Sequence, residues 1–107
     1  MRTALLTRSP RAKQDIKEVL AYTRENWGQA KAWEYSELIQ EALEVIASDP
    51  YRGRPTAAAR AGVYGYHIKQ PGRNARHIIF YRIGANGTVQ IIRFLHDSMD
   101  FDLHLSK

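Results

Sequence analysis

The sequence predicts an α+β domain in which a helical hairpin packs on a small antiparallel sheet, in the order β-α-α-β-β-β. In the first half of the chain, apolar residues recur every three to four positions through two long segments, which is the spacing of amphipathic helices. In the second half, three shorter segments rich in β-branched and aromatic residues are joined by turn residues, as in antiparallel strands. The length of 107 residues suits one core, so we expect a single domain over 1–107.

Local signals mark the limits of the first three elements. Residues 3–7 form a short apolar run between charged residues and predict a strand. Ser9 followed by Pro10 predicts a helix start, because a serine side chain caps free amides and proline loses no hydrogen bond at the first helical position. Gly28 interrupts the helical period and predicts the turn of the hairpin. The second helix is expected to end before Pro50, since a residue that precedes proline avoids helical geometry.

The helical period assigns an inner and an outer face to each helix. The inner face of the first helix is predicted to hold Ala12, Ile16, Val19, Leu20, Thr23 and Trp27, with Asp15, Glu18, Tyr22 and Glu25 opposite. The inner face of the second is predicted to hold Tyr35, Leu38, Ile39, Ala42, Val45 and Ile46. Its outer face carries Trp33 within an acidic stripe of Glu34, Glu37, Glu41 and Glu44.

The second half of the chain predicts a loop and then three strands. The loop covers 50–61, and the strands cover 63–68, 77–83 and 89–95. The Asn-Gly pair at 86–87 is a strong signal for a tight hairpin between the last two strands.

Both faces of the last two strands are apolar. Alternation assigns Val89 and Ile91 to one face of the sheet, and Ile92 and Phe94 to the other. The helical hairpin covers one face. Either the tail at 101–105 or a protein partner is expected to cover the second.

The charges are unevenly distributed along the chain. The formal net charge is +5, yet residues 50–96 contain eight basic and no acidic residues, while residues 15–49 contain eight acidic residues against three basic ones. Most of the basic residues in 50–96 are arginine, which suits bidentate contact with phosphate or carboxylate. The apolar residues between these arginines favour an amphipathic partner protein with acidic groups.

Several function classes are excluded by composition. The absence of cysteine excludes disulfides, a thiolate nucleophile and cysteine-based zinc sites. No apolar run approaches the roughly 18 residues of a membrane span, and the first residues lack the features of a signal peptide. We therefore expect a cytoplasmic protein without membrane association. There is no glycine-rich phosphate loop and no common metal-ligand spacing, so we expect neither a cofactor nor a metal.

Four groups of residues carry a family resemblance, in the same order along the chain. They are Ser9-Pro10-Arg11-Ala12 with Asp15-Ile16, Tyr22-Thr23 and Trp27-Gly28-Gln29-Ala30; Asp49-Pro50 with Gly53-Arg54; Ile79-Phe80-Tyr81-Arg82; and Ile91-Ile92-Arg93-Phe94-Leu95-His96-Asp97-Ser98-Met99-Asp100 with His104-Leu105. Together they resemble the ParE toxins of bacterial toxin–antitoxin modules, within the RelE/ParE superfamily. The resemblance covers almost the whole chain and implies the RelE/ParE-like fold.

The resemblance also implies a function and partners. It implies the toxin of a type II toxin–antitoxin module that poisons DNA gyrase by binding rather than by its own catalysis. The implied antitoxin is a ParD-like ribbon-helix-helix protein, and operator DNA would be reached only indirectly, through that antitoxin.

Two groups of residues are predicted to bind these partners. The antitoxin is expected to meet aromatic, apolar and arginine side chains of the sheet: Tyr64, Tyr66, Arg76, Phe80, Arg82, Ile92 and Arg93. The strand edge at 63–69 is expected to accept an antitoxin strand. The resemblance alone places target binding at His96, Met99, Asp100 and His104.

The alternative within the superfamily is a RelE-like, ribosome-dependent mRNA endonuclease. That chemistry needs cations at the scissile phosphate and a group that handles the 2′-hydroxyl proton, for which the candidates are Tyr81, Arg82, Arg93, His67, His77 and His96. RelE-like nucleases resemble one another in a lysine- and arginine-rich central sheet, whereas Lys69 is the only lysine in the sheet predicted for this chain. Structural roles are favoured for the histidines, with His77 expected at a strand edge. The sequence therefore predicts no catalytic residue.

Overall fold

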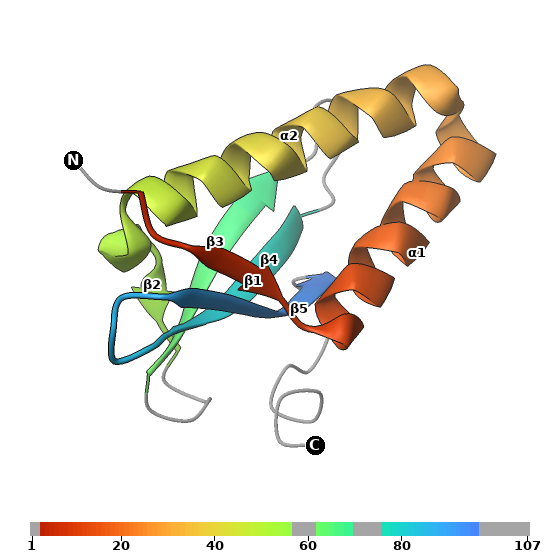
Figure 1. The fold of residues 1–107 in the computed structure, drawn as a ribbon. Helices are drawn as coiled ribbons and strands as arrows, with labels where there is room; N and C mark the ends of the chain where they lie inside the picture. The colour runs from red at the N-terminus through yellow and green to blue at the C-terminus, as the bar shows by residue number, and fades with distance from the viewer. Residues whose placement is uncertain (1–2, 57–61, 70–75, 97–107) are drawn as a thin grey trace.

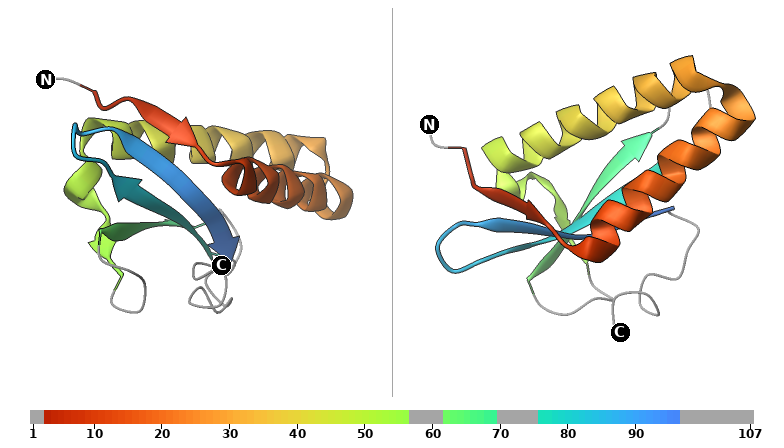
Figure 2. Two further views of the ribbon diagram at one scale, coloured as in Figure 1. Left: turned by 60° about the horizontal axis from the view of Figure 1, so that its bottom comes forward. Right: turned by 45° about the vertical axis from the view of Figure 1, so that its right-hand side comes forward.

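The computed structural model describes residues 3–56, 62–69 and 76–96, and Figure 1 shows their arrangement. The elements in chain order are β1 (Leu6–Arg8), α1 (Pro10–Trp27), α2 (Gln29–Ser48), the 3-10 turn η1 (Pro50–Arg52), β2 (Arg54–Pro55), β3 (Val63–Lys69), β4 (Arg76–Ile83) and β5 (Val89–His96). The two long helices form a hairpin on one face of a five-stranded sheet (Figures 1 and 2). The predicted α+β architecture is confirmed.

The helix limits follow the local signals. The Ser9 hydroxyl accepts a hydrogen bond from the Ala12 amide at 3.0 Å and donates one to the Ile92 carbonyl at 2.8 Å. The cap therefore also ties the start of α1 to β5. Gly28 has φ 94°, a left-handed conformation that glycine adopts without strain, and it forms the turn between the helices.

The sheet has the order β1-β5-β4-β3-β2. The strands from β2 to β5 pair antiparallel, whereas β1 lies parallel to β5. The segment predicted as a loop contains η1 and the two-residue strand β2. Because β2 pairs with Tyr64 and Gly65, it covers part of the β3 edge that the sequence predicted to be open.

A β-bulge changes which face the end of β5 presents. Phe80 pairs with Arg93 and Tyr81 pairs with Ile91, so Ile92 is the extra residue in β5. Phe94 consequently packs in the same core cluster as Ile91. The predicted assignment of Phe94 to the opposite face is wrong because simple alternation does not continue through a bulge.

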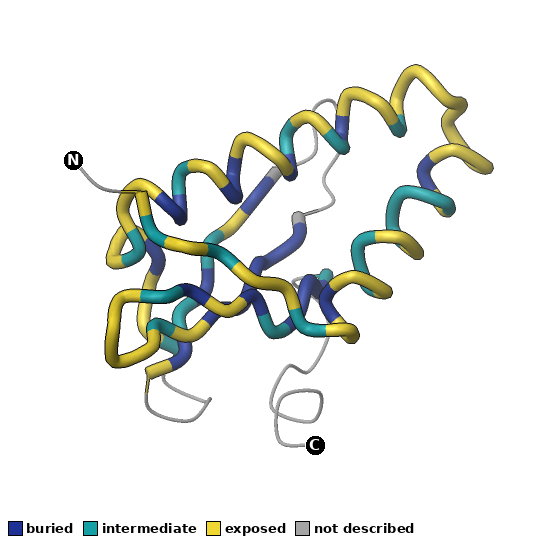
Figure 3. Tube along the Cα trace, viewed as in Figure 1, coloured by how far each residue is buried: buried dark blue, intermediate teal, exposed yellow. Residues whose placement is uncertain are grey.

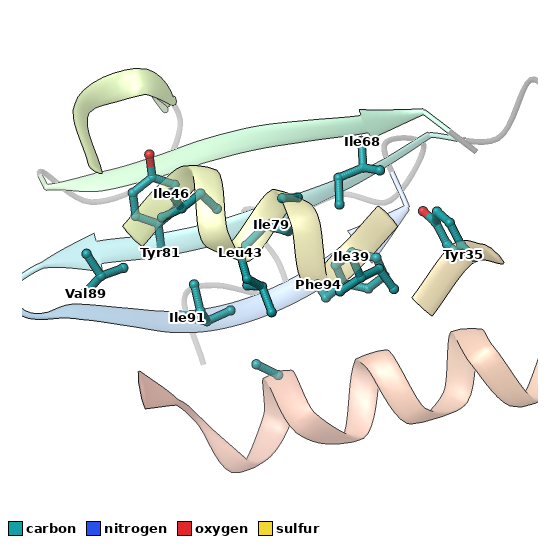
Figure 4. Packing of buried hydrophobic residues seen from close by; sticks show 12 residues of the cluster. Tyr35, Ile39, Leu43, Ile46, Ile68, Ile79, Tyr81, Val89, Ile91 and Phe94 are labelled. Carbon is teal, nitrogen blue, oxygen red and sulfur yellow. The ribbon is translucent and has the colours of Figure 1, made fainter. Parts of the chain in front are cut away.

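The main core lies between the helices and the sheet (Figure 4). It is built from buried side chains of both helices and the inner sheet face: Ala12, Tyr35, Ile39, Ala42, Leu43, Ile46, Ile68, Ile79, Tyr81, Val89, Ile91 and Phe94. A second cluster of Val63, Ile78, Phe80 and Leu95, with Ile92 packed against it, occupies the other face. The tail at 101–105, one of the two expected covers of that face, lies outside the described residues.

The outer surfaces of the helices follow the predicted pattern with two exceptions (Figure 3). The acidic stripe of α2 and Trp33 are exposed, as expected. Trp27, predicted on the inner face, is 53% exposed because the hairpin end extends beyond the sheet (Figure 1). Asp15, predicted on the outer face, turns towards β5. Neither described helix is long and apolar enough to span a membrane.

Candidate functional site

Asp15 and Arg93 form an ion pair between α1 and β5. Arg93 donates through Nε to Asp15 Oδ2 at 2.7 Å and through Nη2 to Oδ1 at 3.0 Å, and the Phe94 amide also donates to Oδ2 at 3.0 Å. Each side chain is only 11% exposed. Arg93, one of the predicted antitoxin anchors, therefore holds the helical hairpin to the sheet. The prediction for Asp15 was wrong because a helical wheel cannot show that β5 reaches this side of α1.

The other predicted antitoxin residues do not share one face. Tyr64 and Tyr66 pack against the main core on the helix side, whereas Phe80 and Ile92 belong to the second cluster. Phe80 is fully buried. Arg82 is exposed, and the side chain of Arg76 lies outside the description of the structure.

A groove of about 220 Å³ with a mixed apolar and polar lining lies between α2 and β3. Its lining residues are Leu38, Glu41, Ala42, Val45, Tyr66, His67 and Ile68. Leu38 and Val45 are only half-buried, although the helical period assigned them to the inner face. The sequence indicated the apolar character of these positions, but it could not show that the sheet stops short of covering them.

A second, basic groove of about 420 Å³ lies where β2 separates from β3. Its lining residues are Arg52, Gly53, Arg54, Gly65, Tyr66 and His67. The sequence analysis treated 50–61 as a loop and assigned no site there, although Gly53-Arg54 belongs to the family resemblance. The signal available in the sequence was the pair of arginines around a glycine in a stretch without acidic residues.

The buried hydroxyl of Tyr81 fixes the turn that carries these arginines. It donates a hydrogen bond to the Pro50 carbonyl at 2.6 Å and accepts one from the Gly53 amide at 3.0 Å. Burial raises the pKa of Tyr81 above its ordinary value of 10.0, so the hydroxyl remains a hydrogen-bond donor at alkaline pH as well. Tyr81, one of the candidate residues for the endonuclease alternative, therefore links β4 to η1 through hydrogen bonds of its hydroxyl.

The histidines are separated in the fold. His77 is buried in β4, a central strand, where its Nδ1 lies 2.7 Å from the Tyr35 hydroxyl and its ring stacks on Phe94. It lies near the start of its strand, as predicted, but it is buried because β3 and β5 flank β4. His96 meets His77 edge-on at 5.3 Å between ring centroids, whereas His67 is exposed at the grooves.

Most of the predicted target-binding group lies outside the described residues. His96 is half-buried at the end of β5, and Met99, Asp100 and His104 follow the last described residue. Within the described ranges, no three histidine, aspartate or glutamate side chains gather in a way that could hold a metal ion.

Comparisons with known proteins agree with this fold. The chain matches the family model described as the ParE toxin of type II toxin–antitoxin system, parDE, over residues 6–101. It is 38% identical over 97 residues to Toxin ParE1 of Caulobacter vibrioides, covering 91% of this chain and 93% of that protein. Toxin ParE1 of Mycobacterium tuberculosis (strain H37Rv) is 33% identical over 97 residues with the same coverage.

A solved structure has the same fold at low sequence identity. A chain of the chromosomal ParDE TA system from P. aeruginosa superposes with a TM-score of 0.68 and 16% identity, over 87% of this chain and 95% of that one. The protein is therefore of the class of type II toxin–antitoxin toxins. Within that class, the chain belongs to the ParE toxin family.

Proposed function

We propose that this ParE-family toxin is held inactive by a ParD-like antitoxin and, when released, poisons DNA gyrase. The observation that carries the proposal is the family match over residues 6–101, joined by curated relatives named as ParE1 toxins. The solved structure with the same fold is described as a ParDE system, which supports an antitoxin as the partner.

The groove between α2 and β3 is the proposed binding site for a segment of the antitoxin. Half-buried Leu38 and Val45 offer an apolar wall, which suits the apolar face of a partner helix. Beyond the residues paired with β2, the β3 backbone from Tyr66 onward faces this region, so an extended antitoxin segment could add to the sheet. Of the antitoxin residues predicted from sequence, Tyr66 lines this groove and Arg82 is exposed.

A pair of matched substitutions tests the groove. Val45→Asp puts a carboxylate into its apolar wall, whereas Ser48→Asp puts the same group at an exposed position of the same helix. We expect Val45→Asp to weaken antitoxin binding at least about tenfold in calorimetry and Ser48→Asp to change it little. Equal affinities of the two variants would remove the groove from the antitoxin interface.

The target is tested by two assays on the purified toxin. A gyrase poison inhibits DNA supercoiling and leaves ribosome-bound mRNA intact, and added antitoxin restores supercoiling. Cleavage of ribosome-bound mRNA without inhibition of gyrase would instead establish the RelE-like alternative. Truncation before His96 should abolish gyrase inhibition if the end of β5 and the residues after it meet the target.

A further inference from the structure

The basic groove arises where pairing between β2 and β3 stops. Arg54 pairs with Gly65 and Pro55 with Tyr64, and the chain before Arg54 turns into η1 instead of continuing along β3. Tyr66 and His67 consequently face the η1–β2 turn across an open groove of about 420 Å³. Two glycines, Gly53 and Gly65, leave part of the wall without side chains.

The cations of this groove are available to a ligand. Arg52 and Arg54 are both exposed. Neither guanidinium forms an ion pair or a hydrogen bond with a residue in the described part of the chain. Among the described residues, no carboxylate lines the groove, and His67 adds a third nitrogen-bearing side chain. Arg93 provides the contrast, because Asp15 already neutralises it. A concave surface with unneutralised cations attracts polyanions.

The backbone that presents these arginines is held in place. The Tyr81 hydroxyl binds the Pro50 carbonyl and the Gly53 amide, which flank the turn. A Cβ atom at residue 53 would collide with that hydroxyl, so the close approach requires glycine. A fixed backbone lowers the entropy lost when a ligand orders the two arginine side chains.

We propose that this groove binds the phosphodiester backbone of single-stranded nucleic acid. Apart from the ring of Tyr66, its lining is polar, cationic or glycine, whereas the apolar wall that an antitoxin segment needs belongs to the other groove. Arg52 and Arg54 are separated by one residue, Gly53, and can contact neighbouring phosphates. Tyr51, 69% exposed and packed edge-on against Tyr64, presents an adjacent aromatic ring on which a base can stack. The proposal goes beyond antitoxin and gyrase binding and does not rest on either of them.

A charge-matched comparison tests the proposal. The affinity of the full-length toxin for a labelled oligo-dT 12-mer is measured by fluorescence anisotropy over a range of salt concentrations. The groove variant is Arg52→Ala/Arg54→Ala, and the control is Lys17→Ala/Arg24→Ala, which removes two exposed cations of α1. We expect the groove variant to raise the Kd at least about tenfold, and to reduce the slope of log K against log salt by about 1.4. The control should change the Kd by less than about threefold.

Two further measurements separate the alternatives. Tyr81→Phe keeps the charge of the groove but removes the two hydrogen bonds that hold the turn, and we expect affinity to fall by at least about fivefold, the equivalent of one of these bonds. Equal losses in the groove and control variants would show general charge attraction and overturn the site. Tight binding of a poly-glutamate peptide at this groove, with no oligonucleotide binding, would identify an acidic protein ligand and also overturn it. We expect the groove variant to bind the antitoxin with unchanged affinity. A loss of oligonucleotide binding alone then tests the nucleic-acid groove separately from the antitoxin groove.

Discussion

Replacing Asp15 by asparagine should destabilise the protein more than any other single change at a polar side chain of α1. The carboxylate accepts three hydrogen bonds, two from the Arg93 guanidinium and one from the Phe94 amide. Asparagine keeps the shape and loses the charge, so the Arg93 side chain, which is only 11% exposed, loses its ion pair with Asp15. Breaking a buried ion pair from one side costs about 3–5 kcal/mol.

The effect is large compared with the total stability of a small domain. The free energy of unfolding of a domain of this size is about 5–15 kcal/mol, and each kcal/mol lost lowers Tm by about 4–8 °C. We therefore expect Asp15→Asn to lower Tm by about 15 °C or more, as measured by circular dichroism. Glu18→Gln is the matched control, since Glu18 is exposed on the same helix and meets only Gln14 at 3.1 Å. We expect a change of less than about 0.5 kcal/mol for the control.

A second substitution isolates the pair itself. Arg93→Met removes the cation, and the double variant with Asp15→Asn lacks both charges of the pair. Because apolar replacements of buried ion pairs are often neutral, the double variant should be more stable than the sum of the single effects predicts. Additive losses, or an Asp15→Asn variant that melts with the Glu18→Gln control, would refute the assignment of this pair as the link between α1 and β5.

Three other outcomes follow from the packing. Burial raises the pKa of Tyr35 and of Tyr81 above the ordinary value of 10.0, so the unfolded chain releases these protons first. Stability should be complete below about pH 10 and fall above it, by about 1.4 kcal/mol per pH unit from Tyr35 and in the same direction from Tyr81, and a Tm that stays level between pH 10 and 11 would contradict this. Gly53→Ala places a Cβ atom against the Tyr81 hydroxyl and should lower the free energy of unfolding, measured by urea denaturation, by about 1–3 kcal/mol. An unchanged urea midpoint would show that the turn moves freely and would contradict the prediction. Trp33→Gln, at a position that is 67% exposed, should change the free energy of unfolding by less than about 0.5 kcal/mol. Ile46→Ala, in the core, should lower it by about 2–5 kcal/mol. Similar urea midpoints for the two variants would contradict the burial described.

The sequence predicted the features that local chemistry determines. Ser9 and Pro10 mark the start of α1, and Gly28 marks the hairpin turn, because a cap, a first-turn proline and a left-handed glycine act within a few residues. The period of α2 predicted four of its buried residues, Tyr35, Ile39, Ala42 and Ile46, but it missed Leu43 and Ala47. These signals established the fold class and the order of the elements without any contact between distant segments.

The features that the sequence missed depend on pairing between distant segments. The bulge in β5 is defined by its register with β4, and it moves Phe94 to the helix side of the sheet. His77 looked like a strand start, yet its strand became central because β5 and β3 lie on its two sides. Arg93 looked like an exposed anchor until Asp15, 78 residues away in the chain, was placed beside it.

The structure therefore divides the basic second half of the chain into arginines with different roles. Arg93 stabilises the fold, while Arg52 and Arg54 stand at a groove on a turn anchored by the Tyr81 hydroxyl. The sequence analysis placed apolar and positively charged side chains on one surface. In the structure, Leu38 and Val45 line one groove, whereas Arg52 and Arg54 line the neighbouring one. Tyr66 and His67 line both grooves, so an antitoxin segment in one and a nucleic-acid strand in the other would meet the same two side chains. This shared wall gives antitoxin binding a direct steric route to displace a nucleic-acid ligand, without any change in the fold.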